Sequence, residues 1–317
     1  MARVAPATSG RRSAEPDVPT VSAVMEKAGH ENFPVASRLL PRQDREHFLA
    51  IYGFARLVDD LGDEAAGDRG RLLDWLEAEL ERAYAGGATH PLMVRLAKTI
   101  RARDLPREPF LHLIRANRQD QSVSRYETYS ELASYCELSA NPVGHLVLYV
   151  LRAATPQRMG LSDAVCTGLQ LAEHWQDVAE DFHRGRIYLP REDLERFGCS
   201  EEDLARSRPS PSLRRLMAFE VARARGLLDR GAPLAGDLGG RAGFAVAGFV
   251  AGGRAALDAL EGAGFDVLGR TPRPSRGHGA WVLVRTVAVS WRPAWPRRGS
   301  GRRRGLRSRS RSRGDGR

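Results

Sequence analysis

The sequence predicts an all-α protein, and two observations support this fold class. Apolar residues recur with helical spacing from about residue 21 to residue 265, whereas stretches of Val, Ile or Thr that alternate with period two are nearly absent. Pro, Gly and Ser cluster at short intervals between the periodic segments, which is typical of a bundle of helices joined by short loops. We therefore expect a helical bundle.

The same pattern predicts the individual helices and the domain limits. The expected helices cover residues 44–64, 69–85, 90–102, 107–119, 129–136, 142–153, 161–184, 212–229 and 240–261. We expect residues 1–20 to be a disordered leader, residues 21–272 to form the helical domain, and residues 273–317 to be a disordered basic tail rich in Arg and Ser.

The charge of the chain is unevenly distributed. The net charge is +10, but residues 292–317 alone hold 11 Arg and one Asp, so the rest of the chain has 38 basic and 38 acidic residues. The high isoelectric point therefore describes the tail and not the body. The three cysteines are far apart and form no CxxC pair, which argues against a disulfide scaffold or a zinc ribbon and favours a reducing compartment.

The ends of the chain bear on its location. The N-terminus lacks the apolar run of a secretory signal, and no stretch reaches the ~18 apolar residues needed to span a bilayer. We expect a cytoplasmic protein. Trp281, Trp291 and Trp295 alternate with arginines, which suggests peripheral binding to the anionic inner face of a membrane. The alternative for this segment is an unstructured, solvated tail.

The first candidate site is the acidic run that begins at Asp59. Phe48, Tyr52 and Ala55 form an apolar stripe with helical spacing, and the next positions of that stripe are Asp59 and Asp63. Like charges four residues apart destabilise a helix by ~0.2–0.5 kcal/mol, and a bound divalent cation would remove this repulsion. The alternative is the solvated end of a surface helix.

The second candidate site is the row of Glu173, Asp177 and Asp181, spaced four residues apart along an expected helix. An ordinary amphipathic helix with a solvated acidic face explains this row equally well. Two acidic rows together are better evidence, because magnesium is typically bound by one or two carboxylates plus substrate phosphates. Arg56, one turn before Asp60, is a candidate phosphate ligand, and its alternative is an ion pair with Asp60.

These motifs resemble the squalene/phytoene synthase family. The resemblance covers roughly residues 28–270 and rests on three segments: Asp59-Asp60-x-x-Asp63, preceded by Ala50–Arg56; Gln170-Leu171-x-x-x-Trp175-Gln176-Asp177-Val178-x-Glu180-Asp181; and Arg184-Gly185-Arg186-Ile187-Tyr188-Leu189-Pro190. Two further segments resemble the hydroxysqualene synthase branch: residues 31–41 and Tyr135-Cys136-x-x-Ser139-Ala140-Asn141-Pro142-Val143-Gly144.

The resemblance implies a fold, a metal and a set of site residues. The fold would be an isoprenoid synthase bundle around a central cavity, with Mg²⁺ between the two acidic motifs and the diphosphate. The implied metal-site and catalytic residues are Asp59, Asp63, Asp177 and Asp181, with Glu173 at a position where the family usually has Asn. The implied substrate-binding residues are Tyr52, Arg56, Asn141, Gln170, Arg186 and Tyr188.

The resemblance also implies an activity. A hydroxysqualene synthase ionises presqualene diphosphate and captures the cation with water, so no nicotinamide is expected. The alternative within the family is condensation of two prenyl diphosphates to squalene, presqualene diphosphate or phytoene. Expected partners are the isoprenoid diphosphate and neighbouring pathway enzymes. The alternative of another class is a nucleic-acid-binding protein that uses the basic tail, but the neutral body argues against specific nucleic-acid binding.

Overall fold

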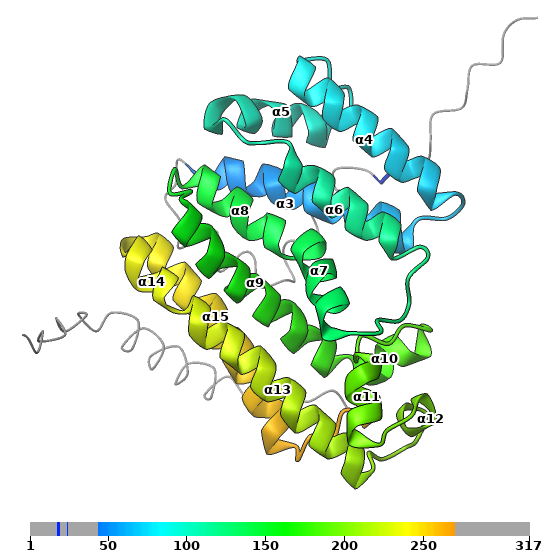
Figure 1. The fold of residues 1–317 in the computed structure, drawn as a ribbon. Coiled ribbons are helices and arrows are strands. Elements are labelled where there is room, and N and C mark those ends of the chain that lie inside the picture. Colours follow the sequence, from blue (N-terminus) through cyan, green and yellow to red (C-terminus); the bar gives the residue numbers. More distant parts are fainter. Residues whose placement is uncertain (1–17, 20–23, 25–43, 270–317) are drawn as a thin grey trace, which may run out of the picture.

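The computed structural model describes residues 18–19, 24 and 44–269. Within these residues all regular structure is helical and no strand occurs, so the predicted fold class is confirmed (Figure 1). The basic tail, the branch motif at residues 31–41 and nearly all of the expected leader lie outside the described residues. The predicted domain limits and the predicted membrane contact of the tail therefore stay predictions.

The described helices follow one another with short connections. They are α3 (Arg45–Asp59), the π-helix η2 (Asp60–Glu64), α4 (Arg69–Ala85), α5 (Pro91–Arg103), α6 (Glu108–Gln119), α7 (Tyr129–Ser139), α8 (Asn141–Val150), α9 (Pro156–Gln176), α10 (Val178–His183), α11 (Arg191–Phe197), α12 (Glu201–Leu204), α13 (Pro211–Gly231), α14 (Pro233–Leu238) and α15 (Gly240–Gly262).

Several helices begin at a capping side chain that the sequence supplies. Asp68, Thr128, Thr155 and Ser210 each accept a hydrogen bond from the backbone N–H three residues later, at the starts of α4, α7, α9 and α13. Each such bond satisfies a backbone donor that the first turn of a helix leaves unpaired. Gly86 ends α4 in the left-handed conformation with φ of 87°, which glycine adopts without steric cost.

The core has two main parts. In the upper half of the bundle, α3, α4, α5, α6 and α8 bury one apolar cluster, and in the lower half α7, α9, α11, α13 and α15 bury a second (Figure 1). The halves meet where α8 packs on α9 and α6 packs on α7. Gly144 allows the close approach of α8 to α9, because a Cβ atom there would lie 2.2 Å from Ser162 Oγ. The acidic motifs lie at the junction of the two halves.

Some predicted helix limits were wrong. The helix expected at 161–184 begins five residues earlier and is interrupted at Asp177, where φ is −104° and ψ is 13°. The helix expected at 142–153 ends at Val150. The Asn141-Pro142 pair begins α8 because proline is tolerated in the first turn of a helix. The short helices α11, α12 and α14 were missed, since segments of a turn or two show little periodicity.

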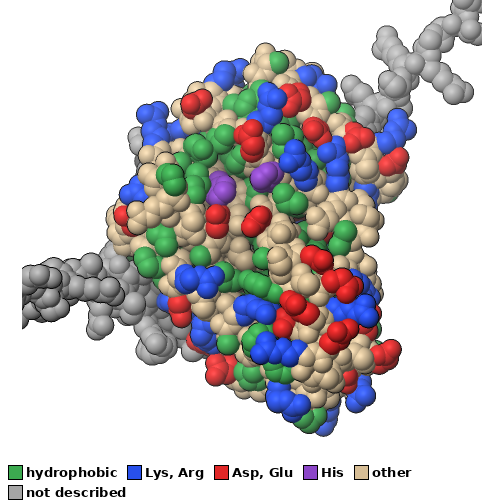
Figure 2. Space-filling view, viewed as in Figure 1, with side chains coloured by type: hydrophobic (Ala, Val, Ile, Leu, Met, Phe, Trp, Pro, Cys, Tyr) green, Lys and Arg blue, Asp and Glu red, His purple; other side chains and the backbone are tan. Residues whose placement is uncertain are grey.

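One helix departs from the expectation that no segment is apolar enough to cross a membrane. α15 is long enough, and an 18-residue window within it has a mean hydropathy of 1.3. However, 61% of that window is buried inside the fold, as is usual for a core helix. On the face shown in Figure 2, basic and acidic side chains are interspersed, in agreement with the neutral body that the sequence predicts.

Candidate active site

The two acidic motifs face one cavity at the junction of the two halves of the bundle. The cavity has a volume of about 310 Å³. We call it the carboxylate cavity. It is lined by Asp59, Asp63, Leu113, Asn117, Asp120, Tyr135, Ser139, Gln170, Glu173, His174, Asp177, Asp181, Arg184, Arg186 and Tyr188. The predicted cavity between the two motifs is therefore present. Asp59, Asp63 and Glu173 are exposed, whereas Asp177 and Asp181 are partly buried.

The first motif leaves α-helical geometry where it meets the cavity. α3 ends at Asp59 and the next five residues form the π-helix η2, a distortion that is common at functional sites. Asp60 is buried and pairs with Arg56 at 2.8 Å, while Asp59 and Asp63 line the cavity. The π-turn thus separates the aspartates of this motif into one structural carboxylate and two that face the cavity.

The glycine inside the first motif has a packing reason that the sequence alone does not show. A Cβ atom at Gly62 would lie 1.9 Å from Asn117 Oδ1, so only glycine allows α6 to approach η2 this closely. Asn117 Nδ2 lies 3.4 Å from Asp59 Oδ1, and Gln121 Nε2 donates to the Gly62 carbonyl at 2.9 Å. α6 therefore fixes the position of the first motif.

The second motif also departs from a regular helix. α9 ends at Gln176, Asp177 stands in the break, and Asp181 lies in the short helix α10. On the opposite side of this segment, Leu171, Trp175 and Val178 are buried in the lower core. The predicted single helical row is interrupted, yet its carboxylates line the same cavity.

The segment after α10 connects the two motifs. Arg186 Nη2 donates to Asp63 Oδ1 at 3.0 Å, which joins the second segment to the first motif. The Tyr188 ring stacks on His174 with centroids 3.7 Å apart. Burial, with a smaller effect from Arg186, lowers the pKa of His174 to about 3, so this imidazole is neutral at physiological pH. It presents a flat aromatic surface with no charge of its own.

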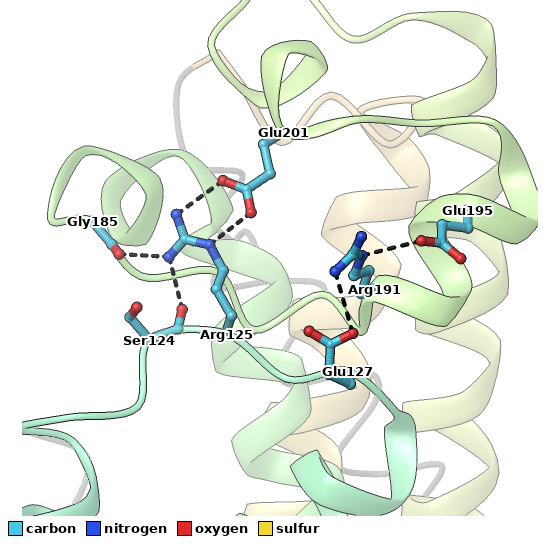
Figure 3. A network of polar contacts seen from close by, with 7 residues as sticks. All are labelled: Ser124, Arg125, Glu127, Gly185, Arg191, Glu195 and Glu201. Carbon is cyan, nitrogen blue, oxygen red and sulfur yellow. Dashed lines mark hydrogen bonds and ion pairs between the residues drawn. The ribbon is translucent and has the colours of Figure 1, made fainter.

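A clamp outside the cavity holds this segment in place. Arg125 Nη1 donates to the carbonyls of Ser124 and Gly185, at 2.8 Å and 2.6 Å, and its other nitrogens pair with Glu201 (Figure 3). The backbone N–H of Ile187 also donates to the Ser124 carbonyl at 2.9 Å. These bonds fix the backbone on both sides of Arg186.

The electrostatics of the cavity fit a bound cation. Burial, supported by neighbouring acids, raises the pKa of both Asp59 and Asp181 to about 7. Asp59 is open to solvent on the cavity side, yet it is enclosed by protein on its other sides. Both carboxylates thus gain from a positive charge in the cavity. No three Asp, Glu, His or Cys side chains among the described residues converge on one ion. The carboxylates of the two motifs are nonetheless the oxygen ligands that magnesium prefers, and magnesium usually completes its shell with phosphate and water oxygens.

Eight of the residues predicted for the site line the cavity, namely Asp59, Asp63, Gln170, Glu173, Asp177, Asp181, Arg186 and Tyr188. Three do not: Tyr52 is buried in α3, Asn141 accepts a hydrogen bond from Thr167, and Arg56 pairs with Asp60 and Glu64. The ion pair considered as the alternative for Arg56 is thus present, and its role in phosphate binding stays a prediction.

Sequence reasoning missed several residues that line the cavity. Asn117 and Asp120 come from the end of α6, and Tyr135 comes from α7. The Tyr135 hydroxyl donates to Asp120 Oδ2 at 2.8 Å. Burial raises the pKa of Asp120 to about 6. These residues form no sequence motif with a recognisable spacing. The one signal in the sequence is Asn117, a polar residue on the apolar face of α6. The aromatic residues Phe54 and Trp175, which lie next to the two motifs in the sequence, are fully buried and do not line the cavity.

The bundle and its paired carboxylates define the class as an all-α isoprenoid synthase fold. The crystal structure of squalene synthase HpnC from Alicyclobacillus acidocaldarius matches with a TM-score of 0.73 and 46% identity, over 75% of this chain and 91% of that chain. The hydroxysqualene synthase of Rhodopseudomonas palustris is 38% identical over 212 residues, 66% of this chain and 71% of the relative. The phytoene synthase of Thermus thermophilus is 34% identical over 288 residues, 90% of this chain and 97% of the relative.

The sequence model of the squalene/phytoene synthase family matches residues 27–278. This chain belongs to that family, whose members are enzymes that process prenyl diphosphates.

Proposed function

We propose that this chain uses Mg²⁺ to ionise presqualene diphosphate and captures the resulting cation with water to give hydroxysqualene. The observation that carries the proposal is the pair of acidic motifs that face each other across one cavity. The relative from Rhodopseudomonas palustris, named hydroxysqualene synthase, supports the choice of reaction.

The site residues have separable tasks in this reaction. Asp59 and Asp63 on one wall, with Glu173, Asp177 and Asp181 on the other, would hold the magnesium. When bound, the metal would neutralise the charge that develops on the leaving diphosphate. Arg186 adds a guanidinium group to the lining of the same cavity, and a guanidinium suits a phosphate group.

The reaction itself is balanced without a redox partner. The carbon–oxygen bond next to the cyclopropane ring of presqualene diphosphate breaks, and both electrons stay on the diphosphate. A water oxygen then bonds to the rearranged carbocation, and its proton passes to solvent. The rings of Tyr135, His174 and Tyr188 supply an aromatic wall that can face a cation without charge repulsion, because the imidazole is neutral and stacked.

Product analysis tests this proposal. Full-length protein is incubated with Mg²⁺ and presqualene diphosphate in oxygen-18 water without NADPH, and the products are identified by mass spectrometry. We expect labelled hydroxysqualene, no response to added NADPH, little product from farnesyl diphosphate, and no turnover in excess chelator. Full turnover in chelator would contradict the role of the metal.

Condensation of two prenyl diphosphates is the second candidate function. It is favoured by the phytoene synthase relative from Thermus thermophilus, which aligns over 97% of its length. Hydrocarbon or presqualene diphosphate formed from farnesyl or geranylgeranyl diphosphate in the same assay would select this function.

A further inference from the structure

A second chamber adjoins the carboxylate cavity and has the opposite character. It has a volume of about 400 Å³ and is lined by Asp63, Glu64, Arg69, Arg184 and Arg186. Asp63, Arg184 and Arg186 line both spaces, so the two are neighbours across these side chains. We call this second space the outer chamber.

Three guanidinium groups meet in the outer chamber from two separate segments. Arg69 is the first residue of α4, whereas Arg184 and Arg186 follow α10. Arg69 Nε donates to the Ala65 carbonyl at 3.1 Å, and no carboxylate among the described residues lies within ion-pair distance of this side chain. Within the part of the chain that the structure describes, Arg69 therefore brings a positive charge that no ion pair neutralises.

The other charges of the chamber are partly cancelled. Arg56 already pairs with Glu64 at 2.6 Å, and Arg186 pairs with Asp63 at 3.0 Å. Arg184 pairs with Glu180 at 2.7 Å, but both side chains are more than half exposed, so this pair is weak. The lining thus has three arginines and two carboxylates, and one of these carboxylates, Glu64, is already paired with Arg56 outside the chamber. An anion is the complementary ligand.

Geometry and charge narrow the class of anion. The carboxylate cavity is acidic and repels an anion until a cation is present, whereas the outer chamber attracts one without a metal. A guanidinium group can bind two oxygens of one phosphate at the same time. Several guanidinium groups around a chamber of this size therefore suit a diphosphate ligand better than a ligand with a single carboxylate.

We propose that the outer chamber is a diphosphate-docking site, through which the diphosphate group enters or leaves the carboxylate cavity. The inference rests on the proposed function only in that the cavity processes a prenyl diphosphate, whichever product forms. Arg69 and Arg184 bind the diphosphate group in the outer chamber. Arg186 lines both spaces, so it can contact the diphosphate group in either of them.

Direct binding tests the docking site without turnover. Isothermal titration calorimetry measures the affinity of the full-length protein for inorganic diphosphate, first in the presence of a chelator and then in the presence of Mg²⁺. The same titration is made for Arg69→Gln, Arg184→Gln and their double variant. Arg71→Gln is the matched control, because Arg71 is an exposed residue of α4 outside the chamber. A thiodiphosphate analogue of the prenyl substrate separates docking of substrate from docking of the released group.

Each chamber variant should weaken diphosphate binding roughly tenfold, as expected for loss of charge-assisted hydrogen bonds, and the control should stay within about twofold. Affinities of the double variant equal to those of the control would overturn the inference, provided circular dichroism shows folded protein. If the chamber variants bind diphosphate more weakly but the parent protein makes no hydroxysqualene, the proposed product is refuted and the docking site is retained. If the parent makes hydroxysqualene but the chamber variants bind diphosphate as tightly as the parent does, the docking site alone is refuted.

Discussion

The two acidic motifs reach the same cavity by different constructions. The first is fixed by packing, because α6 presses Asn117 against Gly62 and Arg56 neutralises the buried Asp60. The second stands at a break between α9 and α10, where Asp177 has left helical geometry. The first motif is thus fixed by a close contact between η2 and α6, whereas the second lies at a break in the helical backbone.

The difference indicates how each motif should tolerate change. A tightly packed motif transmits any added volume directly to its aspartates, because close-packed interiors relax only partly. A motif at a helix break can adjust its backbone by small rotations. We therefore expect substitutions beside the first motif to cost both stability and activity, and substitutions within the second to act mainly through chemistry.

The largest effect should follow from removing one cavity-facing carboxylate of each motif. Asp59→Asn and Asp177→Asn should each lower turnover by roughly a hundredfold or more, because the developing diphosphate charge loses a cation ligand. Thermal unfolding should change little, since the amide keeps the shape and relieves like-charge repulsion. Asp104→Asn is the control, an exposed helix-end position with φ of 49° that asparagine accepts. Near-normal rates in both cavity variants would favour the solvated-face interpretation.

Gly62→Ala tests the tight packing of the first motif. The added Cβ would lie 1.9 Å from Asn117 Oδ1, so we expect about 1–3 kcal/mol of destabilisation together with at least tenfold lower turnover. The control is Gly226→Ala, because a Cβ in that helix meets no atom within 4 Å and should be neutral or stabilising. The double variant Gly62→Ala/Asn117→Ala should recover stability but not turnover, as the contact with Asp59 stays lost. Full activity in Gly62→Ala would show that the first motif is not held by packing.

Glu79 provides a reference outside both motifs. Burial opposes its ionisation, but hydrogen bonds from Thr89, His90 and Arg82 prevail and lower its pKa to about 2. Its stabilisation is therefore complete above the unfolded pKa of 4.5 and is lost as pH falls towards 2.

Glu79→Gln should cost about 1–3 kcal/mol of unfolding free energy at pH 7, since the amide cannot accept all these bonds. Urea unfolding measures this cost, and the gap from the parent should narrow as pH falls from 4.5 to about 2. Turnover per folded molecule should not change. A pH-independent gap would mean that the ionised carboxylate is not the stabilising form.

The smallest effect is expected at Glu173, in the more adjustable second motif. Glu173→Asn restores the residue usual in the family, and we expect turnover within about threefold of the parent, because an amide oxygen can also face magnesium. Steady-state kinetics over a range of Mg²⁺ concentrations measure this effect. Loss of turnover at every Mg²⁺ concentration would assign Glu173 a task that an amide cannot perform.

The local pattern predicted much of the fold. Helical periodicity predicted the helical class, and the apolar stripe that includes Phe48 and Tyr52 identified a buried face. Side-chain spacing also predicted that Asp59 and Asp63 would face inward. The pattern was poor for the short helices α11, α12 and α14, since a segment of one or two turns contains too few residues to show a period.

Within the site, the sequence by itself determined which side chains carry charge and which face of each helix they occupy, because both follow from residue type and helical period. The tertiary structure decided the rest through contacts between residues far apart in the chain. Asn117 shapes the π-turn across 55 positions from Gly62, and Arg186 reaches Asp63 across 123 positions. Such contacts depend on how helices pack, and helical periodicity carries no information about which distant helix supplies the partner.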